Sequence, residues 1–101
     1  MKYNKLVRDK IPEIIKKNND ILIIHIANDK EYYNKLKEKL KEEVNEFLKE
    51  SNEDELADVL EIIYAIRDYM KISEQKLEEI RKNKSEKRGA FKKRIILDET
   101  K

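Results

Sequence analysis

Two pairs of acidic residues near the middle of the chain are spaced so that their carboxylates could bind a metal ion together. Glu43 and Glu46 form one pair, Glu55 and Asp58 form the other, and the members of each pair are three positions apart. Residues at this spacing lie on the same face of a helix, so each pair can present two carboxylates together. Carboxylate oxygens are the ligands that Mg²⁺ and Mn²⁺ prefer. We therefore predict a divalent-cation site built from these four side chains.

The residues between the two pairs predict a turn that brings them together. Ser51 and Asp54 resemble the capping box that opens a helix, so one helix should end just before Ser51 and another should begin just after it. In an antiparallel helical hairpin, residues at equal distances from the turn lie side by side. Each carboxylate of the first pair then faces one of the second. The alternative is a solvated helix face, since 22 of the 101 residues are acidic.

The helix before the turn is predicted over residues 29 to 50, with a polar cap at its start. Its apolar residues recur at three- and four-residue steps and define one face: Tyr33, Leu36, Leu40, Val44 and Phe47. Glu43 and Glu46 border this face, whereas Glu42 lies nearly opposite. The helical geometry therefore selects Glu43 and Glu46 as the inward-facing acids.

The helix after the turn is predicted over residues 52 to 70, and it is apolar around most of its circumference. The apolar residues are Leu56, Ala57, Val59, Leu60, Ile62, Ile63, Tyr64, Ala65 and Ile66. Such a pattern is typical of a helix that is buried on two sides. A chain of 101 residues buries only about two-thirds of its unfolded surface and cannot supply both neighbours. We therefore expect this helix to form a homodimer or a higher homo-oligomer.

A third long helix is predicted over residues 73 to 88. Its apolar stripe begins at Leu77 and Ile80 and continues to Lys84 and Arg88, so these two cations should point towards the protein body. In that position they would suit a bound anion. The plainer alternative is that both are surface cations whose aliphatic stems lie along the helix.

Shorter elements are predicted on either side of these helices. Residues 10 to 18, with Pro12 in the first turn, indicate a short helix. Residues 21 to 26 are rich in β-branched apolar side chains and favour a strand, with residues 94 to 97 as its only candidate partner. We therefore predict an all-α fold in a single domain over residues 1 to 101. It comprises an antiparallel helical hairpin plus a third helix, assembling as a dimeric helical bundle with at most a minor two-stranded β-ribbon.

The composition excludes several classes of function. Cysteine is absent, which excludes disulfides and Cys-ligated zinc, and the single histidine, His25, cannot form a His-based metal cluster within one chain. The 24 basic residues nearly balance the 22 acidic ones, which gives no sign of nucleic-acid binding. No segment resembles a signal peptide or a membrane span, so we expect a cytoplasmic protein without a membrane partner.

Three parts of the sequence share motifs with a known family. They are Glu-Glu-x-x-Glu at 42 to 46 with Glu-Leu-Ala-Asp at 55 to 58, Lys5-Leu-Val-Arg-Asp-Lys-Ile-Pro12, and Arg88-Gly-Ala-Phe91 with Lys93-Arg94. Together they resemble the MazG-type all-α nucleoside triphosphate pyrophosphohydrolases, and in particular a small branch labelled phosphoribosyl-ATP pyrophosphohydrolase-like. The spacer of eight residues between Glu46 and Glu55 is shorter than the family motif usually has.

The resemblance implies an enzymatic activity and assigns metal-binding, catalytic and phosphate-binding residues. The four predicted carboxylates would hold Mg²⁺, with Mn²⁺ as an alternative, and Glu43 or Glu46 would be catalytic by orienting or deprotonating the attacking water. The phosphate-binding residues would be Lys84 and Arg88, with Lys5 and Arg8 as weaker candidates. The implied reaction hydrolyses a nucleoside triphosphate between its α and β phosphates, to the monophosphate and pyrophosphate, in nucleotide-pool house-cleaning. The alternatives are phosphoribosyl-ATP hydrolysis in histidine biosynthesis and a non-catalytic helical dimer that acts as an interaction module.

Overall fold

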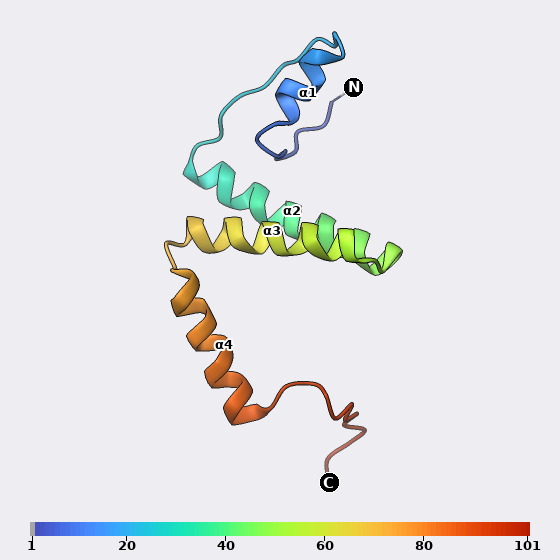
Figure 1. The fold of residues 1–101 in the computed structure, drawn as a ribbon, viewed down its shortest axis with the longest axis vertical. Helices are drawn as coiled ribbons and strands as arrows, with labels where there is room; N and C mark the ends of the chain where they lie inside the picture. The colour runs from blue at the N-terminus through green and yellow to red at the C-terminus, as the bar shows by residue number, and fades with distance from the viewer. Residues whose placement is uncertain (1) are drawn as a thin grey trace.

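Helices are the regular secondary structure of this chain. The computed structural model describes residues 2–101. Within them the chain forms the α-helices Ile11–Lys17 (α1), Asp29–Glu50 (α2), Glu53–Tyr69 (α3) and Glu74–Arg88 (α4), and no strand (Figure 1). The all-α prediction is therefore confirmed, and the boundaries of each helix lie within one residue of those predicted.

Polar side chains fix where α2 and α4 begin. Asn28 Oδ1 accepts a hydrogen bond from the Glu31 N–H at 2.9 Å, and Ser73 Oγ accepts one from the Lys76 N–H at 3.0 Å. Caps of this kind satisfy N–H groups that have no partner inside the helix. Both helix starts therefore follow from short local sequences.

The turn between α2 and α3 consists of Ser51 and Asn52. Ser51 adopts the left-handed conformation, with φ 50° and ψ 45°, and its N–H donates to the Phe47 carbonyl at 2.7 Å. Asn52 caps α3, because its Oδ1 accepts from the Glu55 N–H at 2.9 Å. The predicted capping box at Ser51 is therefore wrong by one residue, since Ser51 takes the left-handed position that ends α2.

Helices α2 and α3 form the antiparallel hairpin that the sequence predicts, and they pack together more extensively than any other pair in residues 2–101 (Figure 1). Leu36 of α2 is fully buried, and it is the one buried residue within residues 2–101. At the end opposite the turn, the Tyr69 ring stacks on Tyr33 with 4.9 Å between centroids, and its hydroxyl donates to the Asp29 carbonyl at 3.2 Å. These contacts hold the open end of the hairpin together.

Helix α4 leads away from the hairpin instead of packing along it (Figure 1). The chain turns at Lys71, which has a φ of 58°, and the Ile72 N–H donates to the Arg67 carbonyl at 3.1 Å. This is the Schellman arrangement that commonly ends helices. Ile80, expected to face the protein body, is 40% exposed. The predicted inward orientation of this helix is therefore wrong within the single chain, because the turn at Lys71 directs it elsewhere.

Residues 21–26 form no strand, so the strand predicted there is wrong within the described residues. Ile21 and Ile23 are almost completely exposed. The candidate partner, residues 94–97, lies at the opposite end of the molecule, with the hairpin in between (Figure 1). A β-branched segment without a neighbouring strand has no hydrogen-bond ladder to stabilise it.

The molecule is elongated and leaves apolar surface uncovered. Its radius of gyration is 18.1 Å, against about 13 Å for a compact chain of this length. The large apolar residues exposed on α3 are Leu56, Leu60, Ile63 and Tyr64. The hairpin alone therefore does not cover α3. Within residues 2–101 no helix combines the length and the apolar content needed to cross a membrane.

Candidate metal and phosphate site

Three carboxylates converge between α2 and α3. Glu43 comes from α2, and Glu55 and Asp58 come from the beginning of α3. One carboxylate oxygen of each lies within 4.8 Å of the others, and all three residues are partly exposed. We call this group the acidic triad. Its donors are all hard oxygen atoms, so the donor set fits Mg²⁺ or Mn²⁺.

Glu46, the fourth predicted ligand, lies outside the acidic triad. Glu46 is exposed, because α2 is rotated against α3 so that Glu43, and not Glu46, lies beside the acids of α3. It is still close enough for its negative charge to act on Glu55. The structure thus brings three of the four predicted carboxylates together, and a role for Glu46 as ligand or catalyst stays a prediction.

Negative charge is most crowded at Glu55. Its pKa is raised above the usual 4.5, first because the carboxyl loses hydration and then because of the charges of Asp58, Glu46 and Glu43. Both effects disfavour the ionised form of a carboxyl group. A bound divalent cation would oppose both effects, because it favours the ionised form of the carboxyl group.

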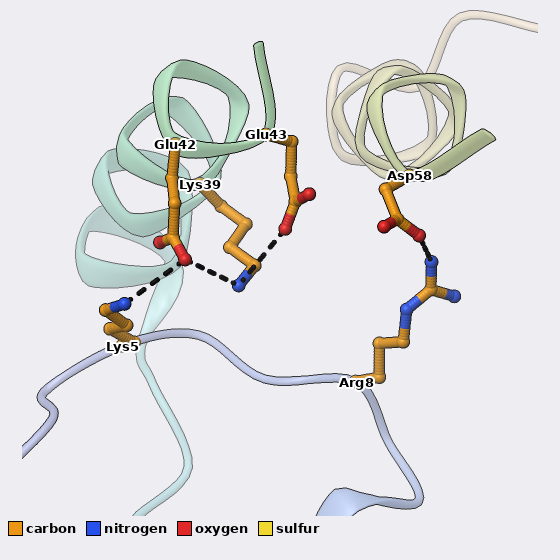
Figure 2. Close-up of polar contacts among 6 residues, drawn as sticks. All are labelled: Lys5, Arg8, Lys39, Glu42, Glu43 and Asp58. Atoms are coloured by element: carbon orange, nitrogen blue, oxygen red, sulfur yellow. Dashed lines mark hydrogen bonds and ion pairs between the residues drawn. The ribbon is translucent and has the colours of Figure 1, made fainter. Parts of the chain in front are cut away.

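Two basic side chains neutralise members of the acidic triad (Figure 2). The Arg8 guanidinium donates to Asp58 Oδ1 at 2.7 Å. The Lys39 ammonium lies 3.4 Å from Glu43 Oε1 and 3.5 Å from Glu42 Oε1, so two neighbouring acids share it. The Arg8 side chain is 59% exposed and that of Lys39 is 19% exposed. Lys39 is therefore the more firmly held of the two cations.

The N-terminal segment, residues 2–10, is attached to α2 by two contacts. The Lys35 ammonium donates to the Asn4 carbonyl at 2.7 Å, and the Lys5 ammonium donates to Glu42 Oε1 at 3.1 Å. Burial raises the pKa of Glu42, but the hydrogen bond from Lys5 and the charge of a second nearby lysine outweigh it, and the pKa lies below its usual value. Glu42, predicted to face away from the site, therefore anchors this segment.

A pocket of about 250 Å³ adjoins the acidic triad. Its apolar wall includes Val7, Leu36 and Ile62, and its charged residues are Arg8, Lys39, Asp9, Glu43, Asp58 and Glu61. Pockets that enclose a drug-sized ligand typically measure roughly 300 to 1,000 Å³. The pocket therefore has room for a group of the size of a phosphate, and the remainder of a larger ligand would extend beyond it.

Lys39 is a site residue that the motifs above do not single out. It precedes Glu43 by four positions on α2, a spacing at which oppositely charged side chains pair on a helix. This spacing is the feature of the sequence that could have identified Lys39. Lys5 and Arg8, the weaker candidates in the sequence, both reach acidic side chains of the hairpin.

Lys84 and Arg88 are not brought to the acidic triad within the single chain. Both are exposed on α4. This helix begins at the end of the hairpin opposite the turn and leads away from it (Figure 1). Their role in phosphate binding stays a prediction.

The fold and the site together define a helical hairpin with three clustered carboxylates, two cations and an adjoining pocket. No protein-family model, curated protein or solved structure matches this chain. The resemblance to MazG-type pyrophosphohydrolases therefore stays a prediction. The function has to be argued from the geometry of the site.

Proposed function

We propose that this protein hydrolyses a nucleoside triphosphate, or a related nucleotide, between its α and β phosphates in a Mg²⁺-dependent reaction. One water molecule is consumed, and the products are the monophosphate and pyrophosphate. The role would be to remove unwanted nucleotides from the pool. The observation that carries this proposal is the acidic triad beside a pocket that also presents Arg8 and Lys39. A metal-bound polyphosphate needs both kinds of group, since its charge is shared between the ion and nearby cations.

Each group has a part that follows from its chemistry. The acidic triad would hold Mg²⁺, which when bound would neutralise charge on the phosphates and orient them. Glu43, on the pocket wall, would accept a proton from the attacking water, with Glu46 as the alternative base. Arg8 and Lys39 would bind phosphate oxygens and stabilise the leaving pyrophosphate. No nucleophilic side chain is needed.

We also propose that the active form is a homodimer or a higher homo-oligomer built on α3. Leu56, Leu60 and Ile63 are 54%, 45% and 38% exposed, and a second copy would remove this apolar surface from water. A second copy is also the way in which Lys84 and Arg88 would reach a triad, because α4 of the same chain leads away from it.

A non-catalytic helical dimer is the second candidate, and the same exposed surface of α3 favours it. In such a protein the carboxylates of the acidic triad would only be exposed to solvent, and divalent cations would not change the melting temperature. Metal binding therefore separates the two candidates.

The first experiment measures thermal stability with and without millimolar Mg²⁺ or Mn²⁺. At a metal concentration of 100 times the dissociation constant, binding stabilises the folded protein by about 2.7 kcal/mol. The Glu43→Gln/Asp58→Asn variant should lose this stabilisation. The matched control is Glu38→Gln/Asp68→Asn, which changes the same residue types on α2 and α3 at exposed positions outside the triad. If the metal does not raise the melting temperature of the unmodified protein, the metal site and the proposed function both fail.

The second experiment measures pyrophosphate release from canonical and modified nucleoside triphosphates, with phosphoribosyl-ATP included. We expect release that requires Mg²⁺ and the acidic triad. A substrate preference for phosphoribosyl-ATP would favour the biosynthetic alternative. If the protein binds the metal but releases pyrophosphate from none of these nucleotides, the proposed activity is wrong.

A further inference from the structure

We propose that Arg8 is a displaceable counter-ion of the acidic triad, which a divalent cation releases from Asp58 and which then binds the phosphates of the ligand. This inference rests on the proposed function and adds a coupling between the metal and the anion. It starts from one contact, the hydrogen bond of 2.7 Å from the Arg8 guanidinium to Asp58 Oδ1 (Figure 2).

The guanidinium and a metal ion compete for the same carboxylate. Asp58 is a member of the acidic triad, and the charge of Arg8 neutralises it. A divalent cation held by Asp58 would repel a guanidinium in direct contact with the same carboxylate. Asp58 therefore favours one of the two cations at a time.

A divalent cation should readily replace the Arg8 guanidinium at Asp58. The side chains of Arg8 and Asp58 are 59% and 38% exposed, and exposed ion pairs typically contribute little to stability. A divalent cation held by the acidic triad would interact with three carboxylates, whereas Arg8 interacts with one. The metal therefore has the advantage.

The other cation of the site behaves differently. Lys39 has a second acidic partner in Glu42, at 3.5 Å, so it can remain in place when Glu43 binds a metal. Asp58 is the single acidic partner of Arg8 in the region that the structure describes. Release therefore leaves the guanidinium without a counter-charge.

The released guanidinium would remain beside the pocket. The N-terminal segment stays anchored to α2 through Lys5 and Asn4, and neither contact involves the acidic triad. Arg8 lines the pocket next to the carboxylates. A guanidinium matches the paired oxygens of a phosphate group. The metal would thus both hold a polyphosphate and free the arginine that recognises it.

The test compares Arg8→Gln with Lys10→Gln, which removes another exposed cation of the same segment that lies outside the pocket lining and the segment's anchors. Mn²⁺ binding is measured by calorimetry without nucleotide, and inorganic pyrophosphate binding is measured in saturating Mn²⁺. Arg8→Gln should bind Mn²⁺ roughly two- to fivefold more tightly, because an exposed competitor is gone. It should bind pyrophosphate at least about tenfold more weakly, because a charge-assisted contact is lost. Lys10→Gln should leave both Mn²⁺ binding and pyrophosphate binding unchanged.

A conservative variant separates exchange from a purely structural role. Arg8→Lys keeps the charge and should restore the Mn²⁺ affinity of the unmodified protein, but it should recover only part of the pyrophosphate affinity, since an ammonium lacks the paired donors. Unchanged or weaker Mn²⁺ binding by Arg8→Gln would overturn the exchange while the metal site stands. If the unmodified protein binds no Mn²⁺, the proposed function and the exchange both fall.

Discussion

Replacing Leu36 by alanine should destabilise the protein more than the same replacement elsewhere on α2. Leu36 is fully buried in the hairpin, whereas Leu48, on the same helix, is 69% exposed. The two substitutions remove the same atoms and have similar effects on helix propensity. The difference between Leu36→Ala and Leu48→Ala therefore isolates the contribution of burial.

The magnitude follows from the position of Leu36. Removing its side-chain carbons beyond Cβ, at about 0.8 kcal/mol for each, costs roughly 2.4 kcal/mol of transfer free energy. An empty cavity would add to this cost. Leu36 lines the open pocket, so water can enter the vacated space and the added term should be small. We expect a loss of about 2 to 3 kcal/mol for Leu36→Ala and less than about 0.5 kcal/mol for Leu48→Ala.

The assay is urea unfolding followed by circular dichroism at two protein concentrations. The two concentrations show whether Leu48 contributes to association, because an interface residue would make its effect depend on concentration. A loss for Leu36→Ala that is no larger than that for Leu48→Ala, at both concentrations, would refute the view that the hairpin core stabilises this fold.

Three further predictions concern assembly, pH and the distal cations. Ile63→Asp should give a monomer or an unfolded chain in light scattering, because it places a charge on the exposed apolar surface of α3. If the unmodified protein is a stable monomer at micromolar concentration, this surface has no partner copy. Glu55→Gln should stabilise the metal-free protein at neutral pH, because the folded pKa of Glu55 is raised above 4.5, and urea unfolding should show the gain disappearing as the pH falls through that folded pKa towards 4.5. Lys84→Gln/Arg88→Gln should leave the melting temperature of the metal-free protein unchanged. If a second copy supplies these cations, the double variant should release pyrophosphate more slowly, with a loss of about 1 to 3 kcal/mol of transition-state stabilisation. Unchanged release kinetics would remove both residues from the site.

The helices of this protein could be predicted from local sequence patterns. The apolar spacing over residues 29 to 50 and the cap at Ser73 act over a few neighbouring residues, so the sequence specifies them without knowledge of the fold. The same locality explains why two acids on α2 and two on α3 could be identified as a candidate cluster. The hairpin follows from the short turn that joins these helices.

The contacts between groups at the site depend on how the segments pack in three dimensions. Arg8 and Asp58 pair across 50 positions of sequence, and no local pattern specifies a contact of that range. The separation of Glu46 from the acidic triad depends on how α2 is rotated against α3. The direction of α4 depends on the left-handed conformation of Lys71, and that turn keeps Lys84 and Arg88 away from the triad of their own chain. Such outcomes arise from packing and chain reversal, which act between segments and have no signature in the spacing of residues along one helix.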